Sequence, residues 1–178
     1  MDFKNCISYI VQNLNAILMK SLSNQQIKIV NQFTSWRFIF FLIWKLPMGF
    51  ISGIRVKSLN HKQCEVTVPF NFLNKNPFKS MYFAVQSMAA ELSTGALVFV
   101  HRSNKNMSII VTNFESIYHK KAVTNIRFLC ADGGSILTSL KKAEETNQPQ
   151  KCIMKSRGYD TSGVCVSEFR VTWSIKKR

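Results

Sequence analysis

The sequence predicts an α+β protein in which an antiparallel sheet wraps around one long central helix, preceded by a helical extension. Three observations support this prediction. Residues 80–101 form one long apolar segment, strand-like alternation occurs on both sides of it, and helical periodicity fills much of the first 46 residues. A chain of 178 residues suits one domain with a modest extension. We therefore predict an extension over residues 1–46 and a main domain over residues 47–178.

The extension is predicted to contain two helices. Ser23 and Asn24 can cap the second, which we expect to run to about Lys45, where Pro47 would stop it. We expect the helical pair to dock on the domain or on a partner subunit. The less favoured alternative lays the basic, Trp-containing second helix on a lipid surface. The first helix is indicated by apolar residues at helical spacing: Phe3, Ile7, Ile10, Val11, Leu14, Ile17 and Leu18.

The main domain is predicted to begin with a hairpin. Ile54 and Val56 alternate with Arg55 and Lys57, and a turn near residues 60–62 leads to a second alternating segment. After a loop comes the central helix, which is apolar nearly all round and so belongs in the interior. Further strands are expected over residues 107–118, 123–131, 151–157 and 164–176, with a short helix over residues 135–146. About six strands and one helix to wrap give the layout of a hot-dog fold.

The charge of the chain is strongly positive. It has 24 Lys and Arg residues against 9 Asp and Glu, a formal net charge of +15, which excludes an acidic binding site for basic partners. Nucleic acid, an anionic membrane and an anionic small ligand are all compatible with this charge, as is an AT-rich coding sequence. Nucleic acid is the least favoured, because the aromatic residues follow strand interiors and helices instead of alternating with basic residues.

Cysteine usage and the apolar segments indicate a cytoplasmic protein. The five cysteines are scattered and form no CxxC pair, so we expect reduced thiols, with neither a disulfide framework nor a zinc site. The segment of residues 36–51 is interrupted by charges and by Pro47, and the central helix carries Glu91. Neither therefore resembles a membrane span. The N-terminus makes a poor signal peptide.

Glu91 is the most informative residue of the sequence. It is the one charged residue between Ser80 and Val100, in a helix expected to be buried. Burial of a lone carboxylate raises its pKa and prepares it for acid–base chemistry. The alternative is that Glu91 turns toward solvent or pairs with a lysine.

The entry to the central helix is the second candidate site. Backbone N–H groups at a helix N-terminus can bind an anion or a developing oxyanion. Ser80 is expected to be an ordinary helix cap, and Asn76 is open to either role. Signatures of P-loop, dinucleotide-binding, GxSxG and HExxH enzymes are absent from the sequence.

This helix resembles that of a known family. The segment NPFKSMY at residues 76–82, followed by AEL at residues 90–92, is similar to the DUF4442 group of thioesterase-like hot-dog proteins. Their helix entry reads roughly N-x-F-x-[ST]-x-Y/F, with an A-E-L element further on. The resemblance extends over about residues 47–176 and leaves the N-terminal helices outside it.

The resemblance implies a set of site residues. Related acyl-CoA thioesterases carry H-G-G at the helix start, where this chain has Tyr82, Phe83 and Ala84. Their Asn and carboxylate positions fall on Asn76 and Glu91. The backbone N–H that polarises the thioester carbonyl would belong to Phe83, whose side chain is bulky for that position. The Ser/Thr that these relatives carry on the following strand falls near Ser108.

We therefore expect a cytoplasmic hot-dog protein that hydrolyses an acyl-CoA or another acyl thioester, with Glu91 as general base or nucleophile. No metal or redox cofactor is expected, since coenzyme A enters only as part of the substrate, and its phosphates could meet Lys120 and Lys121. The resemblance implies a homodimer or homotetramer. The alternative function is a non-catalytic acyl-thioester-binding or assembly module, with a basic membrane-peripheral protein less favoured.

Overall fold

The computed structural model describes residues 22–102 and 106–178. The helix expected over the first twenty residues lies outside them. Six strands form one sheet in the order β1-β2-β4-β5-β6-β3, with every neighbouring pair antiparallel. The strands are β1 (Arg55–Leu59), β2 (Cys64–Val68), β3 (Met107–Tyr118), β4 (Ile126–Cys130), β5 (Gln150–Tyr159) and β6 (Cys165–Lys177).

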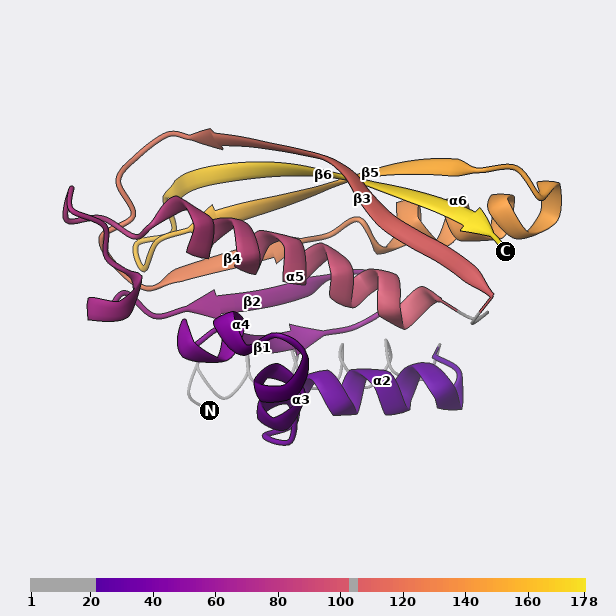
Figure 1. Cartoon of the computed structure of the whole chain (residues 1–178), viewed down its shortest axis with the longest axis horizontal. Helices are drawn as coiled ribbons and strands as arrows, with labels where there is room; N and C mark the ends of the chain where they lie inside the picture. The colour runs from indigo at the N-terminus through magenta and orange to yellow at the C-terminus, as the bar shows by residue number, and fades with distance from the viewer. Residues whose placement is uncertain (1–21, 103–105) are drawn as a thin grey trace, which may run out of the picture.

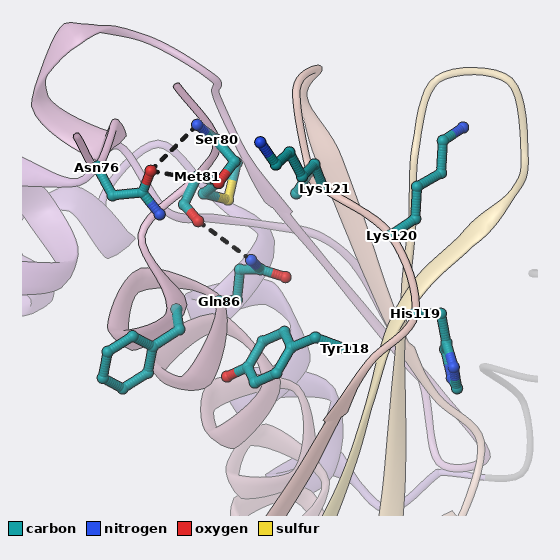
Figure 2. A pocket seen from close by; sticks show the side chains of 10 residues that line it. Asn76, Ser80, Met81, Gln86, Tyr118, His119, Lys120 and Lys121 are labelled. Carbon is teal, nitrogen blue, oxygen red and sulfur yellow. Dashed lines mark hydrogen bonds between the residues drawn. The ribbon is translucent and has the colours of Figure 1, made fainter. Parts of the chain in front are cut away.

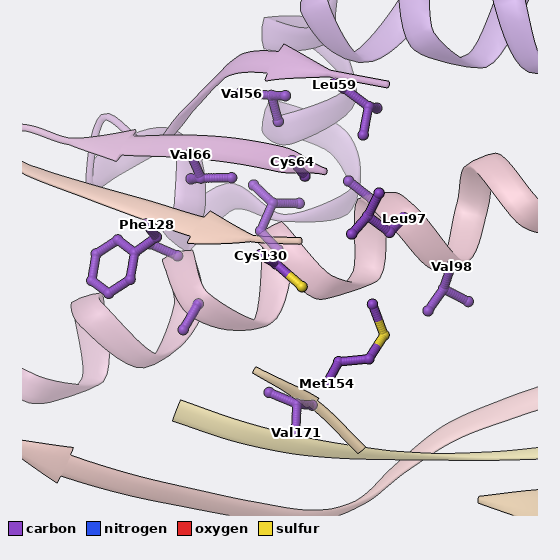
Figure 3. Packing of buried hydrophobic residues seen from close by; sticks show 14 of the residues in the cluster. Val56, Leu59, Cys64, Val66, Leu97, Val98, Phe128, Cys130, Met154 and Val171 are labelled. Atoms are coloured by element: carbon purple, nitrogen blue, oxygen red, sulfur yellow. The ribbon is translucent and has the colours of Figure 1, made fainter. Parts of the chain in front are cut away.

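The central helix is α5 (Phe83–His101), and the sheet curves around it (Figure 1). Val66 and Phe128 approach it from β2 and β4, while Met154 approaches from β5 on the other side (Figure 3). Leu97 of α5 is fully buried between these layers. The helix is long and apolar enough to cross a membrane, but it is mostly buried against the sheet. The prediction of an interior helix is therefore confirmed.

β3 is an edge strand of this sheet and has the bounds that the alternation predicted. It pairs with β6 from Met107 to Tyr118, with a bulge between Val111 and Asn113. Ile110 and Ile117 are both more than half exposed on it. A long edge strand with exposed apolar side chains can pair with another strand.

The helix expected over residues 24–45 is two helices, so that prediction is wrong. Ser23 caps α2 (Asn24–Thr34) through a capping box with Gln26, as the sequence indicated. The chain then becomes extended at Ser35 before α3 (Phe38–Lys45). Phe33 and Phe38 stack across this break with ring centroids 4.8 Å apart. The bend therefore buries aromatic surface that a continuous helix would spread along its length.

Pro47 opens a short helix, α4 (Pro47–Ile51), in addition to ending α3. Proline is tolerated in the first turn because its missing N–H would have no intrahelical partner there. A 3₁₀ turn, η1 (Phe72–Asn74), follows β2, and the buried Asn74 side chain donates to the carbonyls of Ser52 and Pro69. These bonds fasten η1 to the chain just after α4.

The helix that follows α5 along the chain is α6 (Gly133–Thr146), which starts two residues before its predicted beginning. Gly133 is fixed there by a close approach, since a Cβ at this position would lie 2.1 Å from the backbone oxygen of His61. No side chain larger than hydrogen fits without moving the β1–β2 turn.

The four cysteines of the described residues are free. Burial raises the pKa of the Cys64 thiol and raises that of Cys130 to about 12. Both thiols are held in the neutral form and behave as small apolar core residues.

Candidate active site

A cavity of about 350 Å³ opens at the N-terminus of α5. It lies where the loop before α5, the first turn of α5 and the end of β3 meet (Figure 2). Four of the residues predicted for the site line it, together with residues that the prediction did not include. The lining consists of Asn76, Ser80, Met81, Phe83, Gln86, Tyr118, His119, Lys120, Lys121 and Ala122.

The loop before α5 is held by Asn76. Its side-chain oxygen accepts hydrogen bonds from the backbone N–H and the hydroxyl of Ser80, at 3.2 and 3.3 Å. The expectation that Ser80 caps the helix is wrong, because the N-cap is Tyr82, which makes no side-chain cap bond. Met81 joins the loop to the segment after β3 by donating its N–H to the Ala122 carbonyl at 2.7 Å. Asn76 therefore shapes the rim of the cavity.

The first turn of α5 presents backbone donors beside the same cavity. Val85 and Gln86 donate their N–H groups to the Tyr82 carbonyl, at 3.1 and 3.3 Å. The N–H groups of Phe83 and Ala84 precede these first intrahelical bonds, so they are available to a ligand. The Phe83 side chain is 55% exposed and the Tyr82 side chain 45%, with their rings edge to face at 4.8 Å. Both rings thus lie at the surface, and Phe83 also lines the cavity.

Gln86 is a polar residue of this cavity that the sequence analysis missed. It is buried, its amide nitrogen donates to the Met81 carbonyl at 3.3 Å, and its oxygen accepts from the Ser167 hydroxyl at 2.9 Å. These bonds fix the first turn of α5 against β6. A polar amide inside an otherwise apolar helix was the sequence signal that could have revealed it.

The positive side chains of the cavity come from the segment after β3. Lys120 and Lys121 are exposed there, and Lys120 pairs with Asp160 at 3.5 Å. Because the Lys120 side chain is 55% exposed, solvent weakens this pair, which does not hold Lys120 firmly.

Glu91 lies outside this cavity, eight residues further along α5 than Phe83, or about 12 Å at 1.5 Å per residue. It lies between two smaller cavities of about 220 and 210 Å³, both lined by Lys45, Leu46 and Leu92. A Cβ on Gly95 would lie 3.4 Å from a Glu91 carboxylate oxygen and 3.6 Å from the Trp173 ring. The carboxylate is thus set among mostly apolar groups, with Lys45 as the other charged side chain lining these two cavities, and its burial raises its pKa.

Helices α2, α3 and α4 cover Glu91. Leu42 comes from α3, Leu46 is the C-cap of α3, Met48 comes from α4, and Phe33 comes from α2. The sequence analysis placed these helices outside the site because no motif covers them. These helices cover Glu91 only through the tertiary fold, in which they pack beside α5, so no local sequence pattern indicates it.

Ser108 lies away from both groups. It stands near the start of β3, opposite Lys176 of β6, whereas the cavity at the N-terminus of α5 adjoins the end of β3. The ten residues from Ser108 to Tyr118 span about 33 Å of extended strand. One chain therefore divides the predicted residues among three places: the N-terminal cavity, Glu91 under α3 and α4, and Ser108.

One group of possible metal ligands occurs in the described residues. The ligand atoms of His119, Cys165 and Glu168 lie within 4.8 Å of one another. Glu168 is already bound to His119 at 3.3 Å and to Arg157 at 3.2 Å. The guanidinium of Arg157 beside Glu168 lowers the pKa of that carboxyl group. Arg157 thus already neutralises the negative charge that a metal cation would need.

The sequence profile of DUF4442, a domain of unknown function, matches residues 34–175. This chain belongs to the DUF4442 family. No match was found among curated proteins.

Solved structures share the fold of this DUF4442 protein. A probable thioesterase from Pseudomonas aeruginosa, of unknown function, is 20% identical with a TM-score of 0.71, covering 81% of this chain and 97% of its own. A protein of unknown function from Chlorobaculum tepidum is 17% identical with a TM-score of 0.68, covering 80% and 93%. A thioesterase from Haemophilus influenzae is 10% identical with a TM-score of 0.58, covering 76% and 86%. These similarities confirm the predicted hot-dog fold.

Proposed function

We propose that this DUF4442 protein hydrolyses an acyl-CoA or another acyl thioester, with Glu91 as the catalytic carboxylate. The observation that carries the proposal is the position of Glu91, a desolvated carboxylate between two apolar cavities. A carboxyl group with a raised pKa is a stronger base once ionised than an ordinary surface carboxylate. The thioesterases among proteins of the same fold support the same reaction class.

The reaction would proceed by addition of water to the thioester carbonyl. Glu91 takes a proton from water as the oxygen attacks the carbonyl carbon, and the backbone N–H of Phe83 stabilises the resulting oxyanion. The carbon–sulfur bond then breaks, the thiolate accepts a proton, and a carboxylic acid and a thiol leave. Alternatively, Glu91 attacks the carbon directly, and water hydrolyses the anhydride that forms.

This chemistry requires the carboxylate and the oxyanion donor to be nearer than they are in one subunit. About 12 Å of helix separates Phe83 from Glu91, whereas both must reach the same carbonyl group, each within about 3 Å. A two-fold dimer, in which two α5 helices run antiparallel, would bring the N-terminus of one helix toward Glu91 of the partner subunit. We therefore propose a homodimer, or a dimer of dimers, with sites between subunits.

The edge strand β3 is the proposed dimer contact. Its twelve residues offer backbone groups along one edge, with Ile110 and Ile117 exposed on it. Pairing two such edges continues the sheet from one subunit to the next and covers both apolar side chains.

The acyl thioester would lie with its coenzyme A phosphates toward Lys120 and Lys121 and its acyl chain toward the apolar cavities under α3 and α4. A second function stays open because the Phe83 side chain is exposed at the cavity where related enzymes carry glycine. In that case the protein binds an acyl thioester without hydrolysing it.

Free thiol release from acyl-CoAs of several chain lengths tests both functions. We expect turnover by the wild type and a loss of about a hundredfold or more in Glu91→Gln. Glu145→Gln, which changes an exposed carboxylate on α6, should turn over at the wild-type rate. Unchanged turnover in Glu91→Gln would refute the role of this carboxylate. A wild type without turnover, whose melting temperature nevertheless rises with acyl-CoA, would assign the binding function.

A further inference from the structure

α3 is apolar on both of its faces although it lies at the surface of the described structure. Phe38 and Leu42 face inward and are buried. On the opposite face, Phe40 is 52% and Trp44 82% exposed, and Trp36, just before the helix, is 72% exposed. A helix that is apolar all round normally lies in a protein interior or in contact with a membrane. The outward face of α3 is therefore typical of a surface that binds a partner.

The exposed apolar residues continue from α3 onto α4. Single exposed apolar side chains are ordinary on a protein surface, but a contiguous group is typical of an interaction site. Phe72 and Leu73 of η1, fastened to the chain after α4 through Asn74, are 87% and 63% exposed. We define the apolar face as the exposed residues of α3 and α4 with the adjoining tryptophan: Trp36, Phe40, Ile43, Trp44, Met48, Phe50 and Ile51.

The charged side chains of the segment that forms this face are all positive. No Asp or Glu occurs between Leu22 and Cys64 in the sequence. Arg37 and Lys45 lie at the two ends of α3, and the Arg37 guanidinium lies over the Trp36 ring at 5.9 Å. An apolar, aromatic face framed by cations is complementary to a surface that has negative charge above an apolar interior.

A second copy of the chain fits this face less well. A two-fold contact would bring the face against itself, and with it like charges without a compensating carboxylate. The other edge of the sheet, β3, offers a contact that is independent of these helices. α2 packs beside β1, and β1 and β3 are the opposite edges of the sheet.

We propose that the apolar face docks this protein on the surface of an anionic phospholipid bilayer. Trp36 and Trp44 insert at the level of the headgroups, where indole rings have both apolar and polar neighbours. Arg37 and Lys45 contact lipid phosphates. α3 lies along the surface without crossing it, since its eight residues are too few to span a bilayer. The docking surface shares Lys45 and Met48 with the cavity beside Glu91, but docking does not require the proposed hydrolysis.

The test uses the full chain with phosphatidylcholine vesicles, with and without phosphatidylglycerol, by co-sedimentation. We expect binding to the anionic vesicles that weakens as salt is added. The double variant Phe40→Ser/Trp44→Ser should lower the fraction bound at least tenfold. Ile153→Ser, which removes a 59% exposed apolar side chain from β5, is the matched control and should bind as the wild type does.

Brominated lipids provide a second measurement. They should quench the fluorescence of Trp36 and Trp44 but spare Trp173, which is 8% exposed. Binding of the double variant equal to that of the wild type would refute the proposal, as would equal binding to neutral and anionic vesicles. A dimer of the wild type that dissociates in the double variant would assign the face to a second copy instead, which also overturns the proposal.

Discussion

The raised pKa of Glu91 predicts that removing this carboxylate stabilises the fold at neutral pH. Burial disfavours the charged form in the folded protein, whereas the unfolded chain ionises at the ordinary pKa. Above that ordinary pKa the unfolded state loses its proton first, so the folded state loses stability as pH rises. Glu91→Gln keeps the shape of the side chain and removes the charge. It should therefore be more stable than the wild type wherever Glu91 is ionised.

The magnitude follows from the linkage between pKa and stability. Each pKa unit of elevation corresponds to about 1.4 kcal/mol of destabilisation at high pH. In a chain of this size, 1 kcal/mol moves the melting temperature by about 2–4 °C. Glu91→Gln should thus melt about 3–6 °C above the wild type for each such unit, once pH exceeds the folded-state pKa.

Thermal denaturation measured at a series of pH values checks this reasoning. The difference between Glu91→Gln and the wild type should vanish well below the ordinary carboxyl pKa, where both states are protonated, and grow as pH rises. Glu145→Gln, on the exposed surface of α6, should show no such growth. A difference that does not change with pH, or a less stable Glu91→Gln at pH 8, would show that the carboxylate is solvated or paired.

Three further predictions concern other parts of the molecule. Gly133→Ala should destabilise the fold by more than about 2 kcal/mol in urea denaturation, because its Cβ would meet a backbone oxygen at 2.1 Å; a neutral effect would contradict that packing. Lys120→Ser/Lys121→Ser should raise KM for acyl-CoA but not for a truncated thioester without phosphates, and an equal rise for both would remove these lysines from phosphate binding. Ser108→Cys/Ile117→Cys should form an intersubunit disulfide, seen as a doubled mass on a non-reducing gel, unless the dimer uses another edge.

Sequence patterns specified the strands better than the helix boundaries. β3 has the predicted bounds, although its half-buried and exposed positions alternate only over residues 109–112, as far as the bulge between Val111 and Asn113. The break between α2 and α3 could not be predicted, since no glycine or proline occurs there. It depends on Phe33 and Phe38 stacking in the folded chain. Tertiary packing of these two rings, and not local helix propensity, thus determines where α2 ends.

The candidate site was predictable in its chemistry but not in its arrangement. The isolation of Glu91 in an apolar helix indicated a perturbed carboxylate, and the structure gives it a raised pKa. Helical periodicity cannot tell which turn of α5 faces which cavity, because that depends on where α3 and α4 fold. The same limit applies to Gln86, whose partner Ser167 is 81 residues away in the sequence.

The edge strand gives a geometric reason for the isolated position of Ser108. When two copies of an edge strand pair antiparallel around a two-fold axis, overlap is longest if the axis passes through the middle of the strand. For β3 the middle lies between Thr112 and Asn113, beside the bulge. Ser108 would then lie opposite Ile117 of the partner subunit, one residue from the wall of the cavity at the start of α5. A residue that is far from the site within one chain would thus reach the site of the other, in the same dimer that would bring Phe83 toward Glu91 of the partner subunit.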